Sequence, residues 1–142
     1  MRFYLLFLLA VALATTAFSQ VEQNLSPVFE SAAREFGVPA SILKGIAFIE
    51  TRWMHVRPET SHESENNMPP AFGVMGLRDD DWFGHSLTES ARISGLPLSA
   101  VRDDPSANIR AAAAFIAHLA SQENPKPSTA DLLSWFDVVS RP

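Results

Sequence analysis

One glutamate in the chain has the setting of a catalytic acid. Glu50 follows Leu43 by seven residues, which is nearly two turns of an α-helix, so the two side chains should share one helix face. Ile46 and Ala47 flank that line, so we expect the carboxyl on an apolar stripe and in the last helical turn. Burial disfavours a charged carboxylate, and so does the negative end of the helix dipole. Both effects favour the protonated form that a general acid needs.

A plainer interpretation of Glu50 stays open. Amphipathic helices often carry a glutamate at the rim of the apolar stripe, where water solvates it and a nearby cation pairs with it. Lys44 and Arg52 are the nearby cations. Under that interpretation the side chain contributes under about 1 kcal/mol to stability and takes no part in catalysis.

Other clusters of ionisable residues are weaker candidates. His55 and His62 lie near Glu59 and Glu63, but they lack the spacing of two metal ligands on one helix face. Residues 79–81 are three consecutive aspartates without the terminal glutamate of a calcium loop, which favours a solvated turn. We therefore predict no metal site and no cofactor.

Prolines and glycines indicate where the helices around Glu50 begin and end. Ser26-Pro27 is typical of a capped helix start, and Gly37 is expected to end that helix. Pro39 is expected to open the helix that carries Glu50. A long polar stretch at residues 54–70 has no apolar period and is expected to be a mobile loop.

Three further helices are expected in the second half of the chain. Residues 86–89 and 128–131 have the spacing of capping boxes, Gly95 closes the first of these two helices, and Asp104-Pro105 starts the longest helix. The predicted apolar face of the longest helix is Ile109, Ala112, Ala113, Ile116, Leu119 and Ala120. That of the last helix is Leu132, Leu133, Trp135, Phe136 and Val139. Because nothing alternates over a strand length, the predicted fold is mainly α.

Composition narrows the class of protein. A chain of 142 residues with 46% hydrophobic residues is long enough for one domain with its own core. Its formal charge of −5 argues against non-specific nucleic-acid binding. The absence of cysteine excludes a disulfide scaffold, a thiol nucleophile and a cysteine-ligated metal. Oligomeric state cannot be deduced from these features.

The first residues resemble a secretory signal peptide. Arg2 precedes an apolar run at residues 3–14, and Ala17 and Ser19 are small residues at the positions a signal peptidase recognises. A run of this length spans about 18 Å as a helix, well short of the roughly 30 Å of a bilayer core, so no stable membrane anchor is expected. We therefore predict a signal at residues 1–19, a mature domain at residues 20–142, and a secreted or periplasmic location.

The residues around Glu50 resemble the first motif of lytic transglycosylases and goose-type lysozymes, in which a Glu-Ser/Thr pair ends a buried helix. The matching residues are Phe36-Gly37-Val38-Pro39, Ile42-Leu43, Ile46-Ala47 and Ile49-Glu50-Thr51-Arg52-Trp53. Gly73-Val74-Met75-Gly76-Leu77 is similar to the family's Gly-Leu-Met-Gln segment. The stretch from Asp104 to Ala113 is similar to the helix that packs behind the site. The likeness is closest to transglycosylase-like regions that precede amidase domains in secreted cell-wall hydrolases.

This resemblance implies a lysozyme-like helical domain with a short extended segment at the cleft. It implies cleavage of peptidoglycan glycan strands, with Glu50 as the single catalytic acid and base. The substrate-binding residues it implies are Thr51, Trp53, Phe72, Gly73, Val74 and Met75. Trp82 and Phe83 are further aromatic candidates for stacking on sugar rings, although core packing is an equally ordinary role for such side chains.

Two departures from the family pattern point to an alternative. Gly76 replaces the usual glutamine, and the family's third motif, a tyrosine after the last helix, is missing because Tyr4 is the only tyrosine. The alternative is a C-terminally incomplete domain: a catalytically weak peptidoglycan-binding module or a fragment of an N-acetylmuramoyl-L-alanine amidase.

Overall fold

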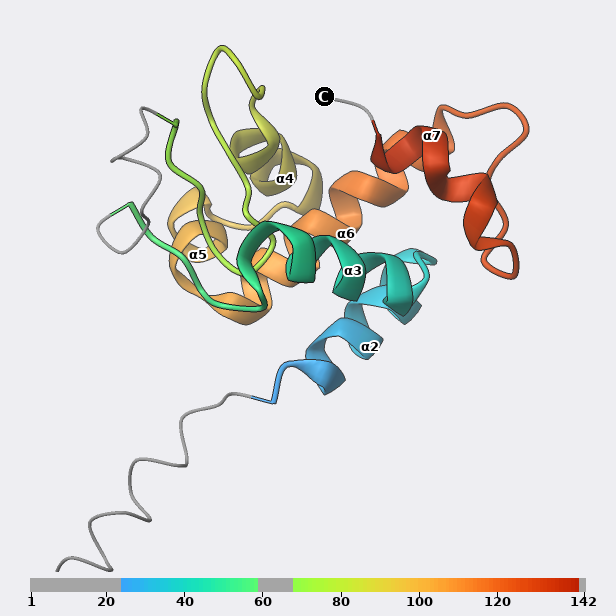
Figure 1. Ribbon diagram of the computed structural model, residues 1–142, viewed down its shortest axis with the longest axis horizontal. Coiled ribbons are helices and arrows are strands. Elements are labelled where there is room, and N and C mark those ends of the chain that lie inside the picture. Colours follow the sequence, from blue (N-terminus) through green and yellow to red (C-terminus); the bar gives the residue numbers. More distant parts are fainter. Residues whose placement is uncertain (1–23, 59–67, 141–142) are drawn as a thin grey trace, which may run out of the picture.

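A computed structural model describes residues 24–58 and 68–140 of the chain (Figure 1). In these residues the protein is built from helices, and its extended pairing is limited to isolated β-bridges. This confirms the mainly α prediction. The predicted signal segment and the middle of the 54–70 loop, with His62, Glu59 and Glu63, lie outside the described residues.

The first two helices follow their proline and glycine signals. Helix α2, Ser26–Phe36, ends at Gly37, whose φ of 68° is the left-handed conformation that glycine adopts without strain. Helix α3, Ala40–Thr51, begins directly after Pro39. The predicted Ser26 cap is wrong, because Ser26 is already helical and its N–H donates to Oδ1 of Asn24 at 3.2 Å.

The longest helix is the centre of the fold. Helix α6, Pro105–Ser121, begins at a cap in which Asp104 accepts the N–H of Ala107 at 2.8 Å. It packs against α2, against α4, Ser86–Ser94, and against α5, Leu98–Asp103, and it runs through the middle of Figure 1. Its predicted apolar face is buried except for a half-buried Leu119. The six-residue helix α5 was not predicted.

The two predicted capping boxes are wrong. Ser86 lies inside α4, and its hydroxyl accepts the backbone N–H of Arg78 at 2.9 Å. Near the C-terminus the cap is Asp131, which accepts the N–H of Leu133 at 3.1 Å. A 3₁₀ helix at Leu132–Trp135 and helix α7, Phe136–Val139, follow. The capping-box pattern failed because the hydroxyl of Ser86 bonds to Arg78 outside its helix, and the hydroxyl of Ser128 accepts the N–H of Ala130 ahead of the helical residues.

The predicted apolar face of the last helix is also wrong. Trp135 and Val138 are buried there, and Nε1 of Trp135 donates to the carbonyl of Ser128 at 3.0 Å. The other apolar side chains of this segment are exposed: Leu132, Leu133, Phe136 and Val139. The change from a 3₁₀ to an α geometry within the segment shifts the inward direction away from a regular helical period.

Exposed ion pairs join helices at the surface. Lys44 of α3 contacts Glu30 of α2 at 2.6 Å, and Arg110 of α6 makes a two-point contact with Glu35 of α2, at 2.6 and 2.9 Å. Within residues 24–58 and 68–140, no helix has both the length and the apolar character needed to cross a bilayer.

Candidate active site

A hairpin turn packs against the end of α3. Phe72 and Leu77 exchange two backbone hydrogen bonds, at 2.8 and 3.0 Å, and close a turn at residues 73–76. Gly73 also pairs with Val56, so the first part of the predicted mobile loop is anchored to this hairpin. The predicted short extended segment is therefore a hairpin fixed on both sides.

Thr51 ties α3 to the hairpin. Its side chain is buried, and its hydroxyl lies 2.6 Å from the carbonyl oxygen of Val74 and 3.0 Å from that of Ala47. A hydroxyl has one proton, so the shorter contact to Val74 is the hydrogen bond across the two elements. Thr51 is thus a positioning residue that sets where the last turn of α3 lies.

Glu50 lies at the edge of the buried stripe of α3 and not on it. Its side chain is exposed, so the predicted burial of the carboxyl is wrong. The buried line of α3 runs through Leu43, Ala47 and Thr51, and each four-residue step turns about 40° past a full turn. The buried stripe therefore reaches Thr51 and leaves Glu50 at its rim.

The plainer interpretation of Glu50 is supported by the exposure of its side chain, whereas the expected pairing with Lys44 or Arg52 is not found in the described residues. Lys44 pairs with Glu30, and the guanidinium of Arg52 lies 4.4 Å from the ring centroid of Phe48. Neither cation contacts Glu50 among the interactions that the structure describes. Glu50 lies instead against the hairpin: a Cβ built on Gly76 would be 2.7 Å from its Cβ and 3.3 Å from its Oε2.

Two glycines of the turn are required by close approach as well as by conformation. Gly76 has a φ of 62°, and any side chain there would displace Glu50. Gly73 has a φ of 74°, and a Cβ there would lie 2.1 Å from Nδ2 of Asn108. Glycine at position 76 therefore has a local reason in this chain.

Asn108 fixes the hairpin from behind. This fully buried side chain of α6 accepts the N–H of Met75 at 2.8 Å and donates to the carbonyl oxygens of Val101 and Phe72, at 2.9 and 3.3 Å. The similarity of this stretch to a helix behind the site is consistent with the contact. The role of Asn108 was not predicted from the sequence. The signal for it is a polar asparagine among the alanines and isoleucines of an apolar helix.

The predicted substrate-binding residues divide into two groups. The side chains of Val74 and Met75 belong to the core, and the backbone of Gly73 is covered by Asn108, so these residues hold the hairpin in place. Phe72 is half-buried against the core. Trp53 is half-exposed, and its Nε1 donates to the carbonyl of Lys44 at 2.9 Å, which holds the indole along a face of α3 different from that of Glu50.

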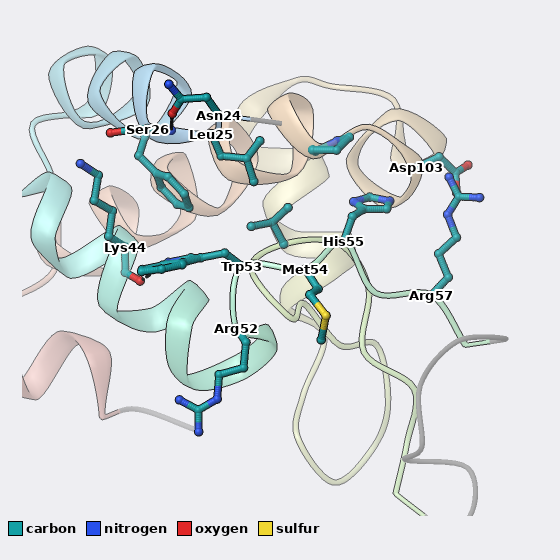
Figure 2. Close-up of a pocket in the computed structure, with 13 residues that line it drawn as sticks. Asn24, Leu25, Ser26, Lys44, Arg52, Trp53, Met54, His55, Arg57 and Asp103 are labelled. Atoms are coloured by element: carbon teal, nitrogen blue, oxygen red, sulfur yellow. Dashed lines mark hydrogen bonds between the residues drawn. The ribbon is translucent and has the colours of Figure 1, made fainter. Parts of the chain in front are cut away.

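A cavity of about 1130 Å³ lies beside this site, and Glu50 does not line it (Figure 2). Its inner surface is mainly apolar, with Leu25, Phe29, Trp53 and Val74. Cationic side chains stand at its rim: Lys44, Arg52 and Arg57. Asp103 is the carboxylate that also lines this cavity, so the rim is mainly basic and an apolar floor with such a rim suits an amphipathic anion.

His55 lines the same cavity and is half-buried. Both of its ring nitrogens are buried without a hydrogen-bond partner among the described residues. Burial is the largest cause that lowers the pKa of His55, and the charge of Arg57 lowers it further, while Asp103 and Asp104 oppose the shift. Across the described ranges, no group of three His, Asp or Glu side chains has the proximity to hold a metal ion.

Comparison with known proteins returned no match to a protein-family model, to a curated protein or to a solved structure. The interpretation of the site therefore depends on the residues and contacts described above.

Proposed function

We propose that the protein cleaves the glycan strands of peptidoglycan, with Glu50 as the catalytic acid and base. The proposal rests on one arrangement above all: Glu50 lies against Gly76 of a hairpin that Thr51 and Asn108 hold in place. A carboxyl at a fixed place on a rigid turn, and open to a ligand, is what proton transfer to a bound sugar requires.

The chemistry needs one carboxyl. Glu50 gives its proton to the glycosidic oxygen as the bond from that oxygen to the anomeric carbon breaks. The carboxylate then accepts the proton of the muramyl 6-hydroxyl, whose oxygen attacks the anomeric carbon and closes a 1,6-anhydro ring. Because this hydroxyl is part of the substrate, no second carboxylate is needed to activate water.

A second function is a peptidoglycan-binding module with little or no turnover. Two observations favour it: Glu50 is exposed in the free protein, and Trp82, on a separate hairpin, is also strongly exposed. Glycan binding is common to both functions, so the two differ in turnover.

Replacing the carboxyl by an amide tests the catalytic role. Glu50→Gln keeps the shape and removes the transferable proton, so release of anhydro-muropeptides from purified peptidoglycan should fall by about 10²–10⁴-fold. The free energy of unfolding should change by less than about 0.5 kcal/mol, because the side chain is exposed. Asp137→Asn is the matched control, since it removes an exposed carboxylate from α7 and should leave turnover unchanged.

The outcomes separate the two functions. Equal product release by the wild type and Glu50→Gln would reject the catalytic role. Binding of both proteins to sacculi without product from either would establish the binding module.

We also propose that the chain is exported to the periplasm or the outside of the cell, on the basis of its first residues. Edman sequencing of the protein from the extracytoplasmic fraction should begin at Gln20. Recovery of the chain with Met1 intact in the cytoplasm or the membrane fraction would contradict this proposal.

A further inference from the structure

A second hairpin follows the first directly along the chain and is closed by its own backbone pairing. Asp80 and Gly84 exchange hydrogen bonds at 3.1 and 3.0 Å. Within this turn, Oδ1 of Asp80 accepts the backbone N–H groups of Trp82 and Phe83, each at 2.8 Å. The other oxygen, Oδ2, is buried without a partner in the described residues, so holding this turn carries a desolvation penalty at the Asp80 carboxylate.

Side chains at the base of this hairpin fix it to α4. Asp79 contacts Nδ1 of His85 at 2.6 Å and accepts the hydroxyl of Thr88 at 2.6 Å. The bond from Thr88 is the largest cause that lowers the pKa of Asp79, so the carboxylate stays charged at neutral pH. The hydroxyl of Ser86 accepts the N–H of Arg78 at 2.9 Å. The hairpin is therefore tied at its tip and at its base.

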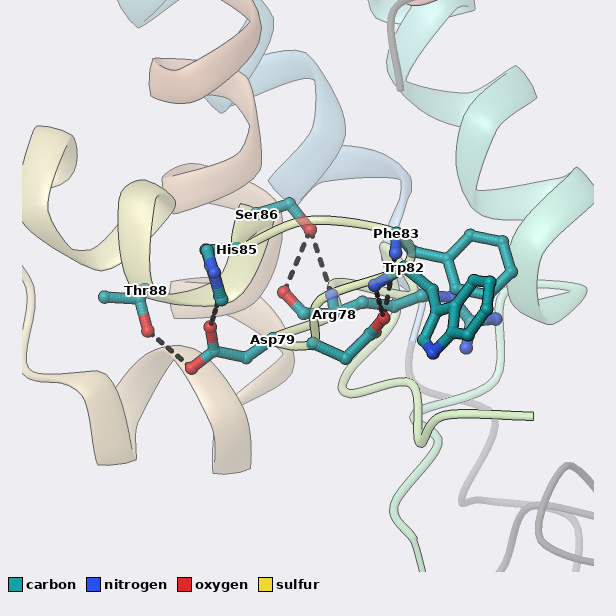
Figure 3. Close-up of polar contacts among 8 residues, drawn as sticks. Arg78, Asp79, Trp82, Phe83, His85, Ser86 and Thr88 are labelled. Atoms are coloured by element: carbon teal, nitrogen blue, oxygen red, sulfur yellow. Dashed lines mark hydrogen bonds and ion pairs between the residues drawn. The ribbon is translucent and has the colours of Figure 1, made fainter. Parts of the chain in front are cut away.

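This hairpin carries two exposed aromatic side chains at its tip. Trp82 is 87% exposed and Phe83 is 45% exposed. Figure 3 shows both rings projecting to one side, away from His85 and Thr88. The guanidinium of Arg78 lies 5.0 Å from the ring centroid of Phe83 and supports that ring from behind. Burying a large apolar side chain stabilises a protein by about 1.5–3 kcal/mol, and Trp82 does not gain that free energy while its ring stays in water. Because the hydrogen-bonded turn nevertheless holds the ring in water, the ring is preorganised for a partner.

The charge around the two rings selects the kind of partner. Three consecutive aspartates, at residues 79–81, make the local charge of this hairpin negative, which disfavours anionic lipid surfaces and nucleic acids. Asp79 and Asp80 hold the hairpin itself, so Asp81 is the exposed carboxylate next to Trp82 that is left for a ligand. A neutral sugar ring presents C–H groups on its face, which suit stacking on Trp82, and hydroxyl donors at its edge, which suit the carboxylate of Asp81.

The position of the hairpin links it to the proposed active site. Arg78 follows Leu77 directly, and the pairing of Leu77 with Phe72 closes the turn against which Glu50 of α3 lies. A glycan strand is a repeating ligand, so a strand held at Glu50 has further sugar units available for a second contact. We propose that the 78–85 hairpin is a separate glycan-binding platform on which Trp82 stacks against a sugar ring. The choice of a glycan as ligand rests on the proposed function.

The experiment measures binding without cleavage. Trp82→Ala is made in the Glu50→Gln background, and the dissociation constant for soluble N-acetylglucosamine oligomers is measured by calorimetry, alongside co-sedimentation with sacculi. Loss of one stacked ring should weaken binding about tenfold. Leu133→Ala is the matched control, because Leu133 is 85% exposed and lies on the 3₁₀ helix near the C-terminus. It should leave the dissociation constant unchanged.

A second variant tests the preorganisation. Asp80→Ala removes the acceptor for the N–H groups of Trp82 and Phe83 but keeps both rings, so it should weaken binding less than Trp82→Ala does. It should also lower the fluorescence anisotropy of a variant in which Trp82 is the only tryptophan left. Equal anisotropy with and without Asp80 would overturn the claim that this side chain positions the indole.

The outcomes also separate this inference from the catalytic proposal. Weakened binding in Trp82→Ala, together with turnover that Glu50→Gln leaves intact, would support the platform and reject the role of Glu50. Unchanged binding in Trp82→Ala would overturn the platform, whatever the turnover. Trp82-dependent partition into phosphatidylglycerol vesicles without oligosaccharide binding would overturn it as well, in favour of a lipid partner.

Discussion

At the scale of single residues, Glu50 and Gly76 depend on each other. The carboxyl-bearing side chain occupies space that a side chain at position 76 would need, and the φ of 62° at Gly76 also disfavours any other residue. The same glycine therefore serves the turn and the placement of the candidate acid.

We expect Gly76→Ala to destabilise the protein by more than the backbone strain alone. A non-glycine residue in the left-handed region costs about 1–3 kcal/mol, and displacement of Glu50 adds to that cost. Gly95→Ala is the control: its φ is 69° with no atom within 4 Å of the built Cβ, so it carries the strain without the clash. Urea unfolding of both variants gives the difference.

A larger loss for Gly76→Ala, together with lower turnover than Gly95→Ala, is the expected result. Equal losses of stability for the two variants would mean that Glu50 moves aside at no cost, and the close approach would then have no part in placing the acid.

At the scale of elements, Asn108 connects α6, α5 and the first hairpin. Removing its amide leaves the N–H of Met75 and the carbonyls of Phe72 and Val101 without their partner in a buried site. We expect Asn108→Ala to lower the free energy of unfolding by about 3 kcal/mol or more, since each buried group left unpaired costs about 1–3 kcal/mol.

Asn24→Ala provides the comparison for this prediction. It removes one exposed hydrogen bond to Ser26 and should cost less than about 1 kcal/mol in the same urea titration. If the two variants were equally stable, water or a neighbouring group would have replaced the amide of Asn108, and its role in fixing the hairpin would be rejected.

Elements whose ends are set by local chemistry could be predicted from the sequence. Gly37 ends α2, Pro39 precedes α3, and the Asp104-Pro105 pair starts α6, because left-handed glycine and first-turn proline act on their own backbone. The apolar face of the last helix could not be predicted, because its regular period is interrupted by a 3₁₀ segment that the sequence does not reveal.

The sequence predicted which segments meet at the candidate site, but it did not predict which of their side chains are buried. The motif order brought Glu50, Thr51 and residues 73–77 together as one expected site, and these residues do meet. Whether the buried stripe of α3 passes through position 50 or 51 depends on what packs against the helix, and the hairpin selected Thr51. Spacing along one helix cannot distinguish two adjacent positions at the rim of a stripe.

At the scale of the whole molecule, the carboxyl groups and the histidine with shifted pKa values titrate in two separate ranges. Hydrogen bonds from Arg110 and Thr88 lower the pKa values of Glu35 and Asp79, so their contributions are lost only as the pH falls through the acidic range. His55 belongs to a higher range, because its pKa is lowered from 6.5.

We expect stability to decline already as the pH falls below about 6.5, and His55 to cause that decline. The unfolded chain binds a proton at His55 in this range, whereas burial makes the folded protein resist it, so acid favours unfolding. The contribution is fully present above the unfolded pKa and is lost on the way down to the folded one. His55→Gln keeps a polar side chain without the titration, so its free energy of unfolding should be flat between pH 5 and 7, within about 0.5 kcal/mol.

Urea unfolding at closely spaced pH values tests this expectation, with His118→Gln as the control because His118 is exposed on α6. The control removes a histidine that does not line the cavity, so it should keep the wild-type slope in the same range. A wild-type slope that persists in His55→Gln would assign the decline to another group.

Protonation of His55 also concerns the cavity, because the buried ring nitrogens of His55 need room and a partner to accept a proton. An anion bound in the cavity at the His55 end would supply that partner, and it should therefore stabilise the wild type more at pH 5 than at pH 7.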